Sequence, residues 1–130
     1  MATEKILRRG IVSAVYPERH SARVTFEDED NLVSAELPVL TTFASKNNFY
    51  ALPDISEQVI CLYEENDGGE GTGVIIGSIY SDVNKPKANS QDICRVDFGE
   101  NFIEANRTTG NLNIKFKGDI TINGKNIYLN

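Results

Sequence analysis

Residues that could carry chemistry are few in this chain of 130 residues, and they stand far apart. The only histidine, His20, has no cysteine or histidine at ligand spacing, whereas a zinc site needs three or four ligands. A serine-histidine-aspartate set cannot be assembled around it, and no serine or cysteine stands in a nucleophile elbow. The sequence therefore predicts that His20 is a surface turn residue and that the protein is not an enzyme.

The segment from Glu64 to Gly71 is acidic and rich in glycine, which raises the question of a calcium or phosphate site. An EF-hand loop needs an acidic residue at its twelfth position, but counting from Glu64 that position is Ile75. No Gly-Lys-Ser or Gly-Lys-Thr follows these glycines, as a phosphate-binding loop requires. We expect a solvated hairpin loop here, and neither a metal nor a cofactor.

The two cysteines, Cys61 and Cys94, are too few for a disulfide framework. Cys61 lies in the apolar run 59–63 and is expected to be a buried small hydrophobe. The N-terminus lacks the apolar core of a signal peptide, and no stretch of about 18 apolar residues could span a membrane. We therefore expect synthesis in a cytoplasm, where both thiols stay free and structural.

Charge bears on nucleic-acid binding, because phosphate contacts dominate such affinity. Residues 1–94 contain 8 basic and 15 acidic residues, a net charge of −7, and the whole chain carries −6. Three aromatic residues, Phe43, Phe49 and Tyr50, could stack on bases, anchor a loop, or lie at a subunit interface, where aromatics are enriched. The acidic body favours the anchor or the interface.

The elements that must position these residues are short strands. Ser21 to Phe26 alternates apolar and polar side chains, as a strand with one buried face does. Gln58 to Tyr63 and Gly73 to Tyr80 are apolar on both faces, so we expect them to be central. Two more strands are predicted at Arg9 to Tyr16 and at Leu32 to Leu37, before a long connection over residues 39–57. Five strands with this long link match the OB-fold, a five-stranded Greek-key barrel.

After a linker at residues 81–90, strands are predicted at Ile93 to Phe98 and Phe102 to Ala105, and then the chain from Asn111 to Gly124 alternates almost without error. Because strand side chains point to opposite faces in turn, we expect an unbroken β ribbon with one apolar face. A small domain has no core to cover that face, so another copy of the chain is expected to cover it. The alternative, a meander with turns at Gly110, Gly118 and Gly124, is disfavoured by the parity kept across Gly118.

Six short motifs follow one another along the chain: Arg9-Gly10-Ile11-Val12, Leu37-Pro38-Val39-Leu40, Pro53 to Val59, Gly77 to Asp82, Lys85-Pro86, and Phe98 to Glu104. In this order and spacing they resemble the phage baseplate assembly protein V family, the central spike of contractile tails, and the OB-fold core of VgrG spikes. The resemblance implies an OB-fold that trimerises, followed by a triangular β-helix in which three chains intertwine as a needle.

Two departures from that family matter. Ser56 stands where the family usually has glycine before Glu-Gln-Val, a minor turn change. Some spikes end in a His-x-His pair that binds an apical iron, whereas Lys125 to Asn130 contains no histidine, so no apical metal is implied. Three such ends would instead present Ile127, Tyr128 and Leu129 to a separate PAAR-like tip protein.

The sequence thus predicts an all-β protein, with an OB-fold barrel over residues 1–90 and a short trimeric β-helix over residues 91–130. Its expected role is a spike that connects the baseplate hub and tail tube to a tip and pierces the target envelope, which it touches only transiently. It would be made in a bacterial cytoplasm and assembled into a virion tail or phage-tail-like particle. The alternative is an OB-fold protein that binds single-stranded nucleic acid. The expected trimer core is Leu112, Ile114, Phe116, Ile120 and Ile122, and the expected subunit or hub interface is Phe43, Phe49 and Tyr50.

Overall fold

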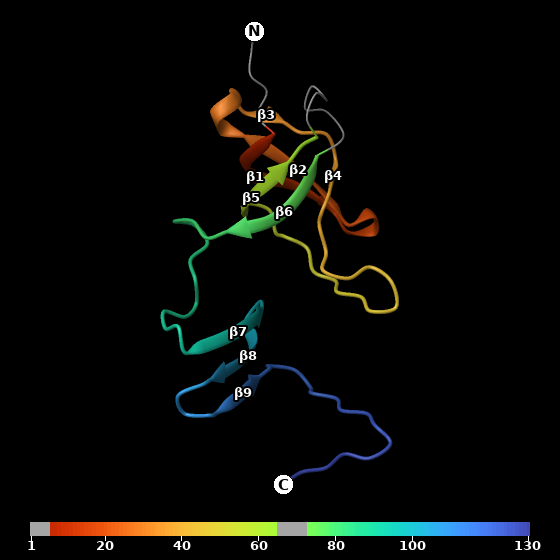
Figure 1. The fold of residues 1–130 in the computed structure, drawn as a ribbon, viewed down its shortest axis with the longest axis vertical. Coiled ribbons are helices and arrows are strands. Elements are labelled where there is room, and N and C mark those ends of the chain that lie inside the picture. Colours follow the sequence, from red (N-terminus) through yellow and green to blue (C-terminus); the bar gives the residue numbers. More distant parts are fainter. Residues whose placement is uncertain (1–5, 65–72) are drawn as a thin grey trace. The chain divides into compact units, whose positions relative to one another are not determined.

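The computed structural model describes residues 6–64 and 73–130, and in these residues the chain is predominantly β-strand (Figure 1). The prediction of an all-β protein is confirmed, because the helical elements there are two short 3-10 turns, η1 (Pro17–Arg19) and η2 (Glu27–Glu29). The chain divides into two compact units, residues 1–85 and residues 86–130. Each unit contains one sheet. The first is the N-terminal sheet and the second the C-terminal sheet.

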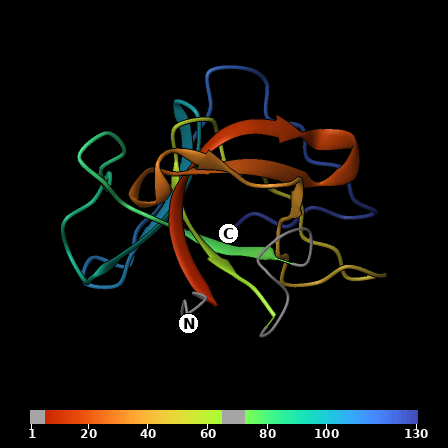
Figure 2. The same ribbon diagram turned by 90° about the horizontal axis from the view of Figure 1, so that it is seen from above.

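The N-terminal sheet is antiparallel, with strand order β3-β2-β1-β5-β6 and with β4 paired to β2. The first half of β1 pairs with β5 and its second half with β2, so this long strand curves from one neighbour to the other (Figure 2). After β4 the chain makes a single parallel bridge from Val39 to Ile75, and the sheet stays open. The strands are β1 (Leu7–Tyr16), β2 (Ser21–Phe26), β3 (Leu32–Val33), β4 (Leu37–Pro38), β5 (Gln58–Leu62) and β6 (Val74–Ile79).

One face of this sheet forms the core. In β2 the alternate residues Ala22, Val24 and Phe26 are buried, as their pattern predicts. The other buried apolar residues are Val12, Leu37, Val59, Cys61, Tyr63 and Ile75. Burial raises the pKa of the Cys61 thiol to about 11, so Cys61 is an unreactive packing residue, as the sequence indicates.

The prediction that β5 and β6 are central strands is right for β5, which lies between β1 and β6, and wrong for β6. β6 is the last strand in the sheet order, and each strand buries one face only: Val59 and Cys61 point into the core, whereas Leu62 and Ile76 are exposed. Both faces of β5 and β6 carry apolar residues, but this unit contains a single sheet, and only one face of that sheet is covered. The outward apolar residues therefore lie at the surface.

The predicted third strand over residues 32–37 divides into β3 and β4. The cause is Ser34, whose hydroxyl accepts a hydrogen bond from the Val24 amide at 2.9 Å while its own amide donates to the Val24 carbonyl at 2.8 Å. A side chain thus takes one place in the ladder, and regular pairing stops for three residues.

The C-terminal sheet is an antiparallel meander of β7 (Ile93–Phe98), β8 (Asn101–Asn106) and β9 (Leu112–Lys115). Both turns use glycine in the left-handed region, Gly99 at φ 62° and Gly110 at φ 76°. The expected turn at Gly110 is therefore present, and the meander that the sequence offered as the alternative exists up to β9.

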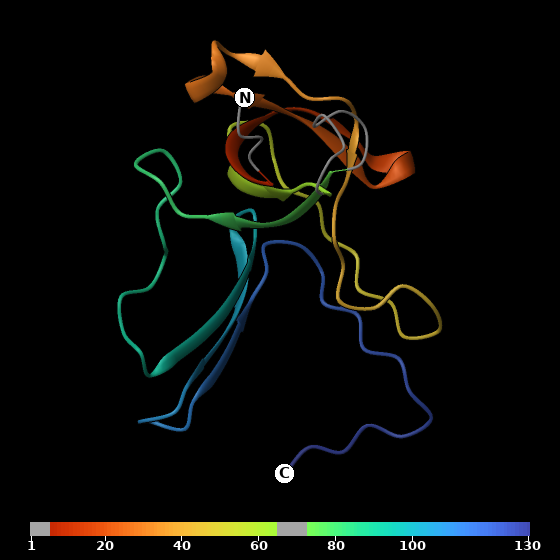
Figure 3. The same cartoon turned by 45° about the horizontal axis from the view of Figure 1, so that its top comes forward.

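The unbroken strand expected over residues 111–124 is not formed within one chain. Pairing ends at Lys115, which lies opposite Phe102, and the backbone bends at Lys117 and Gly118. β8 begins at Asn101, so β9 has no neighbour left to pair with beyond this point (Figure 3). A parity that runs across Gly118 does not by itself supply the partner strand that a β ladder needs.

Candidate interaction surfaces

The register of the C-terminal sheet gathers most of its apolar side chains on one face, with Ile93 and Phe102 on the other. Cys94 lies opposite Ala105, which lies opposite Leu112. The next row is Val96, Ile103 and Ile114. Because directly opposed residues share a face, these rows form one surface, which we call the apolar face.

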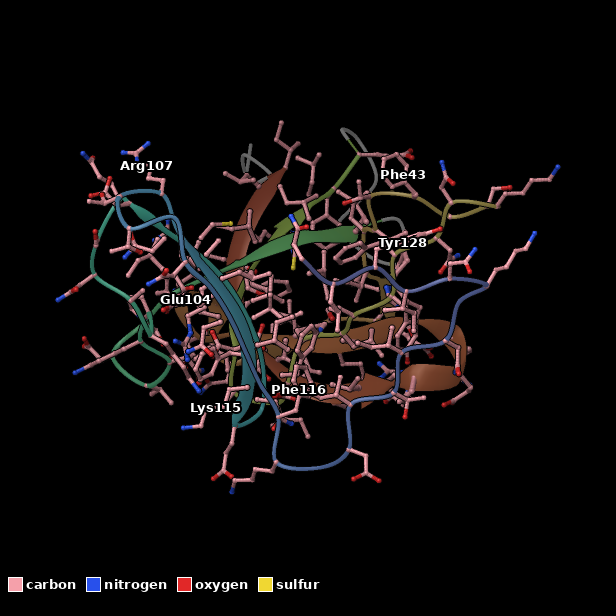
Figure 4. All side chains as sticks on the ribbon, turned by 90° about the horizontal axis from the view of Figure 1, so that it is seen from below. Phe43, Glu104, Arg107, Lys115, Phe116 and Tyr128 are labelled. Carbon is pink, nitrogen blue, oxygen red and sulfur yellow. The ribbon has the colours of Figure 1, made fainter. Side chains whose placement is uncertain are left out.

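The apolar face is uncovered. Leu112 is 65% exposed, and Val96 and Ile114 are each about half exposed. Phe116 is half-buried, with its ring centroid 6.2 Å from that of Phe98. In Figure 4, Phe116 and Lys115 point to opposite sides of the strand. A contiguous apolar surface of this kind is characteristic of a binding interface.

The opposite face of the same sheet carries a cluster in which one arginine pairs with two carboxylates. Arg95 donates hydrogen bonds to Asp97 at 2.9 Å and to Glu104 at 2.9 Å, and its guanidinium carbon lies 3.8 Å from the Phe102 ring centroid. The three charged side chains are only 20–26% exposed. Arg95 holds the pKa of Asp97 below its ordinary value, and the two carboxylates raise the pKa of Arg95.

This distribution is the reverse of that in a sheet packed on a core. The charged residues are largely shielded by one another and by an aromatic ring, and the apolar residues face solvent. Within one chain, the C-terminal sheet therefore leaves its apolar face uncovered.

Sequence reasoning identified only part of this surface. It selected Leu112, Ile114 and Phe116, which the structure places on the apolar face or directly after it. It missed Cys94, Val96 and Ile103, although their alternation with polar residues was a usable signal. It also missed Arg95, whose partners become apparent only once β7 and β8 are in register.

Residues 117–130 are exposed and form no strand. The predicted core residues Ile120 and Ile122 and the predicted tip residue Ile127 are all more than half exposed, and Tyr128 and Leu129 are 86% and 92% exposed. The structure does not bring these residues together with the apolar face into one core. Nothing in the described part of one chain covers them.

A second surface is carried by the loop between β4 and β5, whose residues 39–53 we call the arm (Figure 3). The arm is ordered by its own bonds: Ala44 bridges to Asn48, and the Phe49 amide donates to the Phe43 carbonyl at 3.1 Å. Phe43 and Phe49 are nevertheless 56% and 60% exposed. Of the two interpretations that the sequence favoured, anchor or interface, this exposure disfavours the anchor for these two rings.

Tyr50 does make an anchoring contact, and it does so with the single histidine. The His20 and Tyr50 ring centroids are 5.3 Å apart, and the Val39 amide donates to the His20 carbonyl at 3.0 Å. His20 adopts φ 51° at the end of η1 and is half-buried. The prediction of a turn residue is right, but the side chain is a support for the base of the arm.

A pocket of about 340 Å³ in the N-terminal unit has no catalytic arrangement. It is lined by Glu57, Ser78, Ile79, Tyr80 and Asn84. The Glu57 carboxylate accepts hydrogen bonds from the Asp54 amide at 3.0 Å and the Ser78 hydroxyl at 2.7 Å, so it holds a turn and two strands together. The described part of the chain also contains no group of three or more metal-ligating side chains.

Comparison with known proteins adds no name to these surfaces. No protein-family model matches the chain. No curated protein matches it either.

The question of a calcium site in residues 64–71 falls almost entirely outside the described residues. No helix among the described residues is long and apolar enough to cross a membrane.

Proposed function

We propose that this protein is the central spike of a contractile tail: a homotrimer with no catalytic activity, in which three chains complete one another. The observation that carries the proposal is the contrast between the two faces of the C-terminal sheet. Its polar face is closed by Arg95, Asp97 and Glu104, and its apolar face is open. Covering the apolar face by identical copies removes the exposed surface without requiring a second gene product.

In this assembly the N-terminal sheet is an OB-fold barrel and the C-terminal residues form a short intertwined β-helix. Each chain supplies Leu112, Ile114, Phe116, Ile120 and Ile122 to the axis. Neighbouring chains then provide the partner strands that residues 116–124 lack within one chain. Each such apolar side chain is worth about 1.5–3 kcal/mol when buried, so five from each of three chains would supply much of the needle's stability.

Such an assembly suits mechanical work. A closed triangular needle has no free sheet edge, and each backbone group is paired across chains. It would transmit axial force from the baseplate hub and tail tube to a tip, and pierce the target envelope. Assembly would follow synthesis in a bacterial cytoplasm, and no cofactor or metal would be needed.

The exposed residues Ile127, Tyr128 and Leu129 would contact a PAAR-like tip protein, because they are apolar and uncovered. Co-purification of such a protein with the spike tests this part. We expect Tyr128→Asp to abolish co-purification, since a charge would enter an apolar contact, and Lys125→Ala to leave it intact. Equal recovery of the tip protein with both variants would contradict the contact.

The mass of the protein in solution tests the trimer. Light scattering after size exclusion should give three times the 14.4 kDa chain mass. A monomer at micromolar concentration would refute the proposed function. The measurement needs no partner and no knowledge of the particle.

One observation favours the alternative, binding of single-stranded nucleic acid by an OB-fold. Phe43, Phe49 and Tyr50 are exposed on one loop, as base-stacking aromatics are. The charge of residues 1–94 opposes it, because a net −7 repels phosphate. The two functions differ in whether the protein binds single-stranded DNA with a salt-dependent affinity.

A further inference from the structure

The arm is an exposed, pre-formed and unusually apolar element. Residues 39–53 contain a single charged side chain, Lys46, close to the aromatic pair Phe43 and Phe49. The Thr41 hydroxyl bonds to the Phe49 carbonyl, and the Ser45 amide donates to the Asn47 carbonyl at 3.1 Å. An ordered loop loses little conformational entropy on binding, so its exposed rings are suited to insertion into a partner surface.

The same unit carries a surface of matching chemistry. On the side of β1, β5 and β6 that faces away from the core, Leu7 lies opposite Leu62, which lies opposite Val74. Leu7 is 54% and Leu62 41% exposed, and Ile60 and Ile76 extend the apolar area. We call Leu7, Ile60, Leu62, Val74 and Ile76 the outer strip.

A pocket continues the outer strip along β1 and β5. It has a volume of about 240 Å³ and is lined by Arg9, Gly10, Ile11, Glu27, Asp28 and Gln58. In register, the row of Leu7 and Leu62 is followed by Arg9 with Ile60 and then by Ile11 with Gln58. An apolar strip therefore leads to a pocket lined by two carboxylates and the Arg9 guanidinium, a net negative charge, and the arm offers two aromatic rings and one lysine.

Resting on the trimer proposed above, we propose that the arm of each protomer docks on the outer strip of the next protomer, with Phe43 and Phe49 on the strip and Lys46 toward Glu27 and Asp28. Arm and strip are different surfaces of the same chain, so the contact is head-to-tail. A head-to-tail contact closes into a ring when its rotation matches the symmetry, and a three-fold ring shares its axis with a three-chain needle. The arm thereby explains how the N-terminal units select three copies.

Photo-cross-linking in the full-length protein tests the docking. p-Benzoylphenylalanine replaces Phe49, and trimers are assembled from equal amounts of ¹⁴N-labelled and ¹⁵N-labelled chains. We expect mass spectrometry to find position 49 joined to peptides from residues 7–16 or 58–62, in mixed-isotope pairs that prove contact between copies. The same probe at Val83, which is exposed in the same unit but outside the arm, should not capture these peptides.

A charge exchange provides a second readout. Lys46→Glu should lower the inter-chain cross-link yield roughly threefold, as expected for loss of one exposed ion pair. Combining Lys46→Glu with Glu27→Lys in one chain should restore the yield, because the pair is re-formed with opposite polarity. A Lys46→Glu variant with unchanged yield would contradict the position of Lys46.

The outcomes separate this inference from the proposed function. A trimeric mass with cross-links from position 49 only within one chain, or to a different protein of the particle, overturns the docking and leaves the spike intact. A monomeric mass removes both. A trimeric mass with mixed-isotope cross-links to the outer strip supports both.

Discussion

At the scale of single residues, Arg95 and the two cysteines are the most informative. Arg95 joins Asp97 and Glu104 on one face of the C-terminal sheet, and Cys94 lies on the other face. Cys61 is buried in the N-terminal core, and Cys94 is exposed in the single chain. The two thiols therefore report on different events: Cys61 on unfolding of the N-terminal sheet, and Cys94 on assembly.

Thiol labelling at about pH 8 should distinguish the assembled protein from the single chain. We expect Cys61 to be unreactive because it is buried and its pKa is raised to about 11. Cys94 should also be protected, since the apolar face is covered in a trimer. An assay with dithiobis(nitrobenzoate), in native buffer and then in urea, measures the reactivity of both thiols. Rapid reaction of one thiol per chain in native buffer would contradict coverage of the apolar face.

Acid should weaken the C-terminal sheet through Asp97. Its pKa is held below its ordinary value of 3.8, first by the hydrogen bond from Arg95. The stabilising contribution is therefore fully present above that value and is lost as the pH falls through the lower pKa of the folded state. Melting temperatures measured between about pH 6 and pH 2 should fall at the acid end. Asp97→Asn should fall less steeply, and identical curves would contradict this role.

At the scale of elements, close packing between strands limits what substitutions the two sheets accept. Gly10 in β1 has no room for a side chain, because an added Cβ would lie 2.4 Å from a Val24 methyl and 2.8 Å from the Thr25 carbonyl oxygen. Gly77 in β6 has open space around it. The two glycines belong to the same sheet, and neither has a positive φ.

We expect Gly10→Ala to destabilise the N-terminal sheet by about 1–3 kcal/mol, because the backbone must shift to accept the methyl group. Gly77→Ala should change stability by less than about 0.5 kcal/mol. Denaturant unfolding of both variants gives the comparison. Equal denaturant midpoints for the two variants would show that β1 and β2 can move apart without loss of stability.

Phe116 tests whether the alternate apolar side chains of residues 111–124 face the axis of the proposed trimer. Phe116→Asp would place three like charges near a dry axis, a penalty larger than the burial of about 1.5–3 kcal/mol lost for each ring. Lys115→Asp, on the polar parity, should be nearly silent. We expect protease cleavage near Lys87 to release the C-terminal residues of the first variant only, while residues 6–64 stay folded. Equal resistance of the two variants would refute the intertwined needle.

At the scale of the whole molecule, charge and symmetry govern behaviour. The whole chain carries a net charge of −6, and residues 95–130 are close to neutral, with 5 basic and 4 acidic residues. In the proposed trimer, near-neutrality of the C-terminal residues would let three identical copies approach. The acidic N-terminal residues, by contrast, are unsuited to a phosphate backbone.

We therefore expect no binding of single-stranded DNA at physiological salt. A gel-shift titration with a fluorescent oligonucleotide, carried up to about 10 μM protein, would measure DNA binding. The weakest typical non-specific dissociation constants are about 100 μM, so a shift within this range would mean binding tighter than that. Lys46→Ala should give the same result as the unaltered protein. A salt-dependent complex of micromolar affinity would favour the nucleic-acid alternative over the spike.

The local amino-acid sequence predicted which residues become strands where polarity alternates. The bounds of β2 (Ser21–Phe26) and β7 (Ile93–Phe98) follow from it, because a strand's period of two is a local property. It also determined the turn at Gly110. It also indicated that the apolar side chains after residue 110 would stay uncovered within one chain, because a small domain has no second core to cover them.

Strand partners and their register emerged only in the folded chain. That Ser34 interrupts a predicted strand, that Arg95 meets Glu104 across two strands, and that β6 is an edge are all consequences of register. The end of β9 at Lys115 has the same origin, because a strand extends only as far as its neighbour does. Alternation specifies faces locally, whereas register and partners depend on contacts between residues distant in sequence.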